Sequence, residues 1–197
     1  MILYSDLDDI YCHRARFLLA EKVAEHEFRY VTSQADTEDL LTISPYNILP
    51  AVTDRDFFLY ESRVVMDYIN ERYPFPPMFA GDTQTRAKQR LALYRIQQDW
   101  YDQADILVLE SDPMEKARRY LIDAIKEWDT LVTPEGYLMS DEFSMLDCYA
   151  VPILWRLSHW GIADAEIGQN IRLYSQQMYK RPAFMASLTV AEQKLRP

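Results

Sequence analysis

The side chains of this chain that could take part in a reaction are few, and Cys12 is the first to consider. Cys12 lies at the start of an expected helix over residues 10–24, where a helix N-terminus can lower the pKa of a thiol and favour the thiolate. The alternative, which we favour, is a buried and unreactive cysteine, a common occurrence in protein cores. Cys148 is far from Cys12 in sequence, and neither the cysteines nor the three histidines have metal-ligand spacing, so we expect no metal site.

Two short stretches, Pro50 and the pair Glu61-Ser62, lie where a strand and a helix are expected to begin. Pro50 stands before the apolar run 51–53, where a proline, which cannot donate to a strand ladder, gives a sharp entry into a strand. Glu61 and Ser62 open a helix that we expect to end at Arg72. A hydroxyl can cap free backbone amides there, and an acid suits the positive end of the helix. This capping role needs no ligand.

The composition excludes several classes of function. A length of 197 residues with 49% hydrophobic residues fits one compact unit or two small domains. The formal net charge of -10 argues against direct binding of nucleic acid, because a phosphate backbone would be repelled. The four glycines form no phosphate-binding motif, so we expect no nucleotide cofactor and indeed no cofactor at all. We find no membrane-spanning run and no signal peptide, and expect a cytoplasmic protein with free thiols.

The first 73 residues alternate between strand and helix patterns. Strands are expected where short apolar or alternating runs occur, at residues 2–4, 27–31, 51–53 and 57–59. Helical spacing predicts helices at residues 10–24 and 61–72, and a short irregular helix at 36–42. The predicted order is β-α-β-α-β-β-α, and a right-handed crossover makes the first two strands parallel. Residues 1–73 thus form a small α/β domain.

A proline-rich linker, residues 74–82, separates this domain from an all-helical domain over residues 83–197. The prolines of the linker cannot continue a helix and favour a stiff, extended path. Helices are expected at residues 83–111, 114–131, 144–159, 165–178 and 184–195. The third of these begins with Ser144 and Asp147 in a pattern like a capping box. Because it is apolar all round, we expect it to be the central, buried helix.

These features together resemble the glutathione transferase fold over essentially the whole chain. The resemblance rests on the order of elements, the proline before the third strand, the Glu-Ser pair and the capping motif of the helical half. It implies a thioredoxin-like N-terminal domain and an all-α C-terminal domain. It also implies that Pro50 is the cis-proline of the family, and that Glu61 and Ser62 are its glutathione-holding pair, here vestigial.

A closer resemblance is to the bacterial stringent starvation protein A family. It rests on stretches spread over both halves, among them Asp9-Ile10-Tyr11, Leu19-Ala20-Glu21-Lys22, Glu61-Ser62-Arg63, Asp99-Trp100-Tyr101 and Ser140-Asp141-Glu142-Phe143-Ser144. The resemblance implies a regulator that associates with RNA polymerase holoenzyme and its sigma factor under stress or starvation, and that is not a transferase.

A transferase of this fold needs a hydroxyl or thiol near the start of its first helix to stabilise the glutathione thiolate. Comparison with serine- and cysteine-type members of the family puts Asp9 at that position, and a carboxylate repels a thiolate. We therefore expect no catalytic residue and no enzyme. The alternative is a glutathione-dependent transferase or thiol enzyme that uses Cys12, or Tyr4, whose simpler role is packing in a strand. A further alternative is a scaffold that binds glutathione or another small anion at Glu61 and Ser62 without turnover.

The resemblance also implies a polymerase-contacting surface on a Pro-His-Pro turn of the linker, where this chain has a phenylalanine instead of the histidine. Phenylalanine cannot titrate or donate a hydrogen bond, but it offers a rigid apolar anchor. The expected partner-binding residues are Arg72, Tyr73, Pro74, Phe75, Pro76 and Pro77. The alternative is that Phe75 and Phe79 are buried.

A basic stripe occurs inside this acidic protein. It consists of Arg86, Lys88, Arg90 and Arg95. The stripe is either a solvated helix face or a surface that meets acidic residues of a second subunit. Because transferase-like folds commonly pair through this region, we expect a homodimer.

Overall fold

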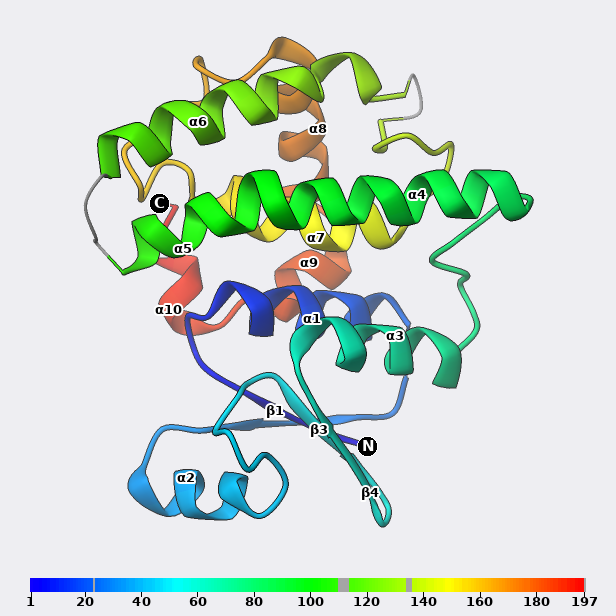
Figure 1. Ribbon diagram of the computed structural model, residues 1–197, viewed down its shortest axis with the longest axis vertical. Coiled ribbons are helices and arrows are strands. Elements are labelled where there is room, and N and C mark those ends of the chain that lie inside the picture. The colour runs from blue at the N-terminus through cyan, green and yellow to red at the C-terminus, as the bar shows by residue number, and fades with distance from the viewer. Residues whose placement is uncertain (23, 110–113, 134–135, 197) are drawn as a thin grey trace. The chain divides into compact units, whose positions relative to one another are not determined.

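The structure is a computed structural model that describes residues 1–22, 24–109, 114–133 and 136–196. Its internal contacts divide the chain into two compact units (Figure 1). Unit 1 comprises Met1–Pro77 and Pro182–Leu195, and unit 2 comprises Met78–Arg181 with Arg196. This grouping differs from the predicted division, which assigned residues 182–195 to the second domain.

Unit 1 contains a four-stranded mixed sheet with helices on both faces. Its elements are β1 (Ile2–Ser5), α1 (Ile10–Glu21), β2 (Glu27–Tyr30), α2 (Gln34–Leu41), β3 (Ala51–Asp54), β4 (Phe57–Tyr60), α3 (Ser62–Arg72), α9 (Pro182–Ser187) and α10 (Val190–Gln193). The strand order is β2-β1-β3-β4. The predicted order of elements and the parallel pairing of β1 with β2 are confirmed, and β3 is antiparallel to both of its neighbours.

The two faces of this sheet are buried by different helices, α1 and α3 on one side and α2 on the other (Figure 1). Tyr4 of β1 and Ala51 of β3 pack with Leu40 of α2 in one apolar cluster. Leu3 and Val52, which lie opposite each other in the β1–β3 ladder, are completely buried. Because successive side chains of a strand alternate, these two face away from α2.

Local capping explains two differences from the predicted helices of unit 1. Instead of a short irregular helix at 36–42, α2 is a regular helix that begins at Gln34, because Ser33 and Asp36 form a capping box. Instead of one helix at 184–195, the structure has α9 and α10. α9 ends at Ser187, and Thr189 is the N-cap of α10, since its hydroxyl accepts a hydrogen bond from the backbone N–H of Glu192.

Unit 2 is helical apart from one isolated bridge between Val132 and Leu138 among its described residues. Its elements are α4 (Thr83–Ile96), η1 (Gln97–Tyr101), α5 (Asp102–Val108), α6 (Met114–Glu127), η2 (Asp129–Leu131), α7 (Met145–Arg156) and α8 (Gln169–Tyr179). The helix predicted over 83–111 is divided by η1, a π-helical turn, and its last two residues lie outside the described residues. The helix predicted at 165–178 begins only at Gln169. Asp129 accepts a hydrogen bond from the backbone N–H of Ile171, 2.9 Å away, and so caps this start.

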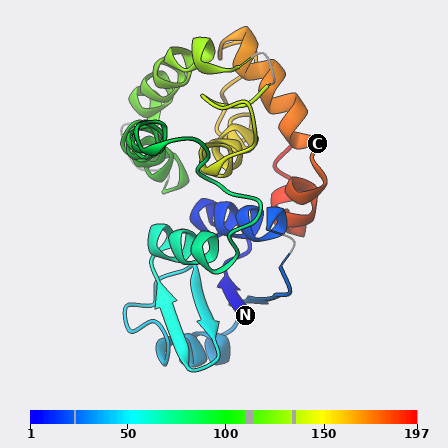
Figure 2. The same cartoon turned by 90° about the vertical axis from the view of Figure 1, so that its right-hand side faces the viewer.

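The predicted capping box and central helix of unit 2 are confirmed. Ser144 and Asp147 cap α7, every residue of which is buried, and α7 runs beside α4 (Figures 1 and 2). Burial raises the pKa of Asp147 to about 6, although the carboxylate accepts hydrogen bonds from Ser144 and from the Tyr174 hydroxyl. No helix in the described part of the chain has the length and apolar character needed to cross a membrane.

Candidate functional site

The start of α1 is the place where a sulfur-activating group would have to lie. Asp9 is the N-cap of this helix, and its carboxylate accepts a hydrogen bond of 2.6 Å from the backbone N–H of Cys12. The Cys12 sulfur in turn accepts a hydrogen bond from the backbone N–H of Asp6, with an N–S distance of 3.3 Å. Cys12 is completely buried. Its burial and the nearby Asp9 carboxylate raise the pKa of the Cys12 thiol well above its ordinary value, so the group stays protonated at neutral pH.

Tyr4, the other residue considered for thiol activation, is part of the sheet core. Its side chain is buried in the cluster with Leu40 and Ala51. Its hydroxyl accepts a hydrogen bond of 3.2 Å from Arg29, whose guanidinium lies over the ring, 5.3 Å from its centroid. These contacts account for Tyr4 by packing.

Glu61 and Ser62 have different roles at the start of α3. Glu61 is the N-cap, and its carboxylate accepts hydrogen bonds of 3.2 Å from the backbone N–H groups of Arg63 and Val64. The backbone of Glu61 has a φ of 76°, which residues other than glycine rarely adopt, and these bonds stabilise this conformation. The expectation that a hydroxyl caps this helix is wrong. The Ser62 hydroxyl is 4% exposed; it accepts a hydrogen bond of 2.7 Å from Nε of Arg14.

Pro50 lies where the resemblance implied. It is buried directly before β3, and the Leu49–Pro50 peptide bond is cis. Pro50 and Ser62 thus belong to the interior of unit 1, while the Glu61 residue is exposed.

A buried ion pair lies behind the start of α1 and was not predicted. Nη2 of Arg16 is 2.6 Å from Oε2 of Glu192, and both side chains are completely buried. Nδ1 of His13 is 3.3 Å from the other oxygen of Glu192. Arg16 also donates to the Ser5 hydroxyl and to the carbonyl of Asp6. The sequence signals were charged residues inside an apolar helix and a Thr-x-x-Glu capping pattern at 189–192.

Residues Arg72 to Pro77 form a turn that follows α3. Phe75 is 79% exposed, more than any other large hydrophobic side chain among the described residues. The alternative that Phe75 is buried is therefore wrong. Phe79 is partly buried, and the guanidinium of Arg90 lies over its ring at 4.7 Å. The Phe75–Pro76 peptide bond is cis.

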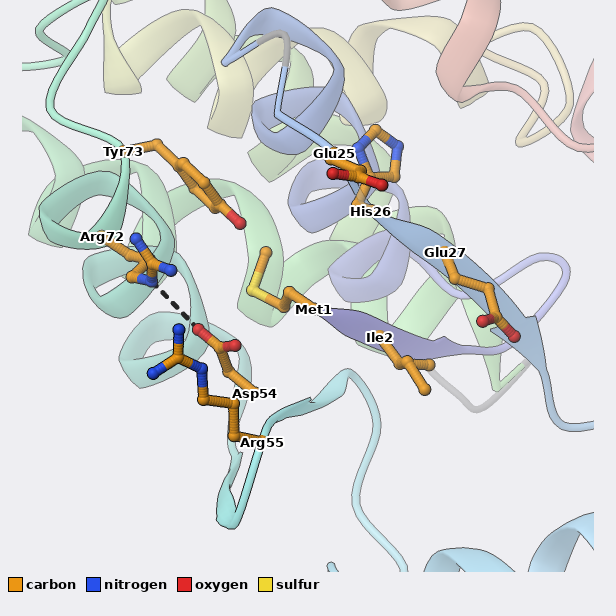
Figure 3. Close-up of a pocket in the computed structure, with 9 residues that line it drawn as sticks. All are labelled: Met1, Ile2, Glu25, His26, Glu27, Asp54, Arg55, Arg72 and Tyr73. Atoms are coloured by element: carbon orange, nitrogen blue, oxygen red, sulfur yellow. Dashed lines mark hydrogen bonds and ion pairs between the residues drawn. The ribbon is translucent and has the colours of Figure 1, made fainter.

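An open pocket of about 600 Å³ adjoins the first residues of this turn (Figure 3). Its lining residues carry charges of both signs and comprise Met1, Ile2, Glu25, His26, Glu27, Asp54, Arg55, Arg72 and Tyr73. Asp54 accepts hydrogen bonds from the Tyr68 hydroxyl at 2.8 Å and from Nε of Arg72 at 3.0 Å, and these bonds hold the pKa of the Asp54 carboxyl below its ordinary value. An open pocket with mixed charge differs from the enclosed, apolar sites typical of small ligands.

The basic stripe on α4 is partly engaged within unit 2. Arg86 donates a hydrogen bond of 2.7 Å to the carbonyl of Gly81, and Arg95 pairs with Asp99 at 2.8 Å. These contacts are those of a solvated helix face, whereas pairing with a second subunit stays a prediction. No group of three or more metal-ligating side chains occurs within the described ranges.

Comparisons with known proteins agree on one fold. Residues 3–77 match the family model described as glutathione S-transferase, N-terminal domain. The stringent starvation protein A homolog of Pasteurella multocida is 38% identical to this chain, over 98% of this chain and 92% of the relative. The homolog of the same name from Coxiella burnetii is 37% identical, over 100% and 95% respectively. The crystal structure of glutathione transferase Omega 3C from Trametes versicolor superposes with a TM-score of 0.84 at 19% identity, over 95% of this chain and 88% of that chain. The predicted glutathione-transferase-like fold is confirmed.

Proposed function

This chain belongs to the stringent starvation protein A family, and on this premise we propose that it regulates transcription by binding RNA polymerase holoenzyme and its sigma factor. The binding surface is the turn formed by Arg72, Tyr73, Pro74, Phe75, Pro76 and Pro77, and the effect on transcription needs no transferase chemistry. The observation that carries this proposal is the 79% exposure of Phe75.

An exposed phenylalanine between prolines has the properties of an interface anchor. Aromatic side chains supply much of the binding energy of protein interfaces, and a stiff turn loses little conformational freedom on binding. Beside it, the guanidinium of Arg72 lies 5.2 Å from the centroid of the Tyr73 ring, so a second aromatic group is held close to the anchor. A partner with an apolar pocket buries Phe75 there and contacts the guanidinium of Arg72 beside it.

The side chains at the positions where a transferase would bind or activate glutathione are engaged in the fold instead. Asp9 caps α1, Cys12 is a buried and protonated thiol, and the Ser62 hydroxyl binds Arg14. These contacts favour a regulator over an enzyme that uses Cys12 or Tyr4, and over a scaffold for glutathione.

The proposal includes a cytoplasmic homodimer. The cysteines support this location, because Cys12 and Cys148 are both buried and form no disulfide bond, as is usual in a reducing compartment. The dimer is supported by the resemblance, because transferase-like folds commonly pair through the region that carries the basic stripe in this chain.

The test is capture of purified RNA polymerase holoenzyme by the immobilised full-length chain. We expect Phe75→Ala to weaken capture by about tenfold or more, the loss typical of an anchor residue. The matched control is Leu109→Ala, which truncates a hydrophobic side chain that is 75% exposed in unit 2, and it should leave capture unchanged. Normal capture by Phe75→Ala would reject the turn as the binding face, and no capture by the wild type would reject the function.

A parallel assay tests the alternative chemistry. Retention on glutathione-agarose together with thiol-conjugating turnover, both lost in Cys12→Ala, would establish the enzyme in place of the regulator. We expect neither retention nor turnover for the wild type.

A further inference from the structure

The turn that carries Phe75 is held from inside unit 1 by one lysine. Lys22 is the C-cap residue of α1, and its backbone N–H donates to the carbonyl of Leu18. Nζ of Lys22 donates a hydrogen bond of 2.6 Å to the carbonyl of Pro76 and another of 2.8 Å to Oδ1 of Asn70. The ammonium group therefore joins the end of α1, the helix α3 and the turn.

The burial of Lys22 makes these bonds strong constraints on the turn. The residue is only 4% exposed, although lysine is almost never buried without partners. A buried ammonium group must keep its acceptors, because an unpaired charge away from water is very unfavourable. The position of the Pro76 carbonyl is therefore fixed relative to the packed helices α1 and α3.

The residue before this carbonyl group's proline is the proposed anchor, Phe75, the most exposed large hydrophobic side chain among the described residues of unit 1. Phe75 directly precedes Pro76, and the backbone N–H of Tyr73 donates to the carbonyl of Ile69 at 3.0 Å. The turn is thus attached to the helical layer on both sides of Phe75, at Tyr73 and at Pro76. Prolines 74 and 76 restrict the backbone between these two points further.

We propose that Lys22 is the positioning residue of the polymerase-binding surface: its ammonium group fixes the Pro76 carbonyl and thereby the direction in which Phe75 is presented. This inference rests on the proposed function. It adds to that function a residue that touches no partner and acts only through the turn.

The first test is a double-mutant cycle in the polymerase capture assay. Lys22→Met keeps the length and the apolar stem of the side chain but removes the ammonium group. We expect it to weaken capture by about tenfold, because the turn loses the charge-assisted hydrogen bond that fixes the Pro76 carbonyl. The double variant Lys22→Met/Phe75→Ala should bind no more weakly than Phe75→Ala alone, since the lysine acts only through Phe75. Lys126→Met, which changes an exposed lysine of unit 2, is the control and should bind like the wild type.

The second test needs no polymerase. 4-Fluorophenylalanine placed at position 75 reports the conformation of the turn by fluorine NMR. We expect Lys22→Met to move this signal toward its position in the urea-unfolded chain, and Lys126→Met to leave it in place. Asn70→Ala, which removes the other acceptor of the ammonium group but keeps Lys22, should give a smaller shift in the same direction. It remains informative if Lys22→Met does not fold.

The outcomes separate the inference from the function on which it rests. If Phe75→Ala abolishes capture but Lys22→Met and Asn70→Ala leave both capture and the fluorine signal at wild-type values, the function stands and the role of Lys22 is refuted. Additive losses in the cycle also refute it, because the lysine would then act by another route. If the wild type captures no polymerase, the function fails, and an unmoved fluorine signal in the folded variants shows separately that Lys22 does not fix the turn.

Discussion

Two regions of unit 1 differ in whether their candidate functional side chains are bonded within the unit or exposed to solvent. At the starts of α1 and α3, Asp9, Cys12 and Ser62 are each hydrogen-bonded within unit 1. At the turn after α3, Phe75 lies 79% exposed, and the turn is fixed through its backbone rather than through that ring. Unit 1 therefore has one region whose polar side chains form hydrogen bonds within the unit, and one region whose aromatic side chain is exposed to solvent.

The difference supports the proposal that this transferase-like fold acts by association rather than by transfer. Polar groups that point inward and bind one another contribute to stability, and a ligand could engage them only by breaking those bonds. An exposed aromatic side chain contributes little to stability and is available for association. Changes at the first region should therefore affect the free energy of unfolding, and changes at the second should affect binding.

The largest effect is expected at the buried ion pair behind α1. Arg16→Met leaves Glu192 buried without its closest cation, and we expect the free energy of unfolding to fall by about 3–5 kcal/mol. Urea unfolding of the purified chain measures this loss. The control is Arg119→Met, which breaks an exposed i,i+4 pair with Glu115 and should change stability by less than about 0.5 kcal/mol. Equal losses in the two variants would contradict the structural role given to Arg16.

A smaller loss is expected at Ser62, at the start of α3. Ser62→Ala removes the acceptor of the Arg14 guanidinium from a buried position, and should lower the free energy of unfolding by about 1–3 kcal/mol. Thermal and urea unfolding measure the change, and retention on glutathione-agarose should stay absent in both proteins. A wild type that is retained, and loses retention without losing stability in Ser62→Ala, would show that this hydroxyl serves a ligand.

The thiol of Cys12 should be protected from reagents by its burial and by its raised pKa. At pH 8 we expect alkylation of the native chain by iodoacetamide to be slower than that of the urea-unfolded chain by about tenfold or more, because the buried sulfur is inaccessible and stays protonated. Peptide mapping by mass spectrometry identifies the site. Because the folded pKa lies above the unfolded one, the unfolded chain releases this proton first as pH rises past 9.0, and stability should fall there. Rapid labelling of Cys12 at pH 7 would contradict this.

The smallest effect on stability is expected at the exposed turn. Phe75→Ala should change the free energy of unfolding by less than about 0.5 kcal/mol, because the side chain is mostly in solvent in the folded chain. Urea unfolding beside the polymerase capture assay measures both quantities on one preparation. A large loss of stability would show that Phe75 is a packing residue, and the contrast between the two regions would disappear.

The elements that were predicted correctly are those with local causes. Periodicity predicted the order of strands and helices over residues 1–73, and the spacing of Ser144 and Asp147 predicted the start of α7. Thr189 and Glu192 carry the same kind of local signal, a capping box, which divides the helix predicted at 184–195. Such features depend on residues three or four apart, so they can be read from a short window of sequence.

The contacts that were missed join residues far apart in the chain. Arg16 and Glu192 are separated by 176 positions, and Lys22 and Pro76 by 54. Neither pair has a periodic signature, because the fold alone brings the partners together. The role of Ser62 was misassigned for the same reason, since Arg14, 48 positions away, binds the hydroxyl that was expected to cap α3.

The grouping of residues 182–195 with unit 1 has a consequence for biosynthesis. The sheet is translated early, but Glu192, whose carboxylate neutralises Arg16, is translated only after residues 78–181 of unit 2. Until then a cation destined for the interior has no counter-charge, and a nascent chain halted after Pro77 has an incomplete thioredoxin-like half. Completion of unit 1 is thereby postponed until translation has passed Glu192.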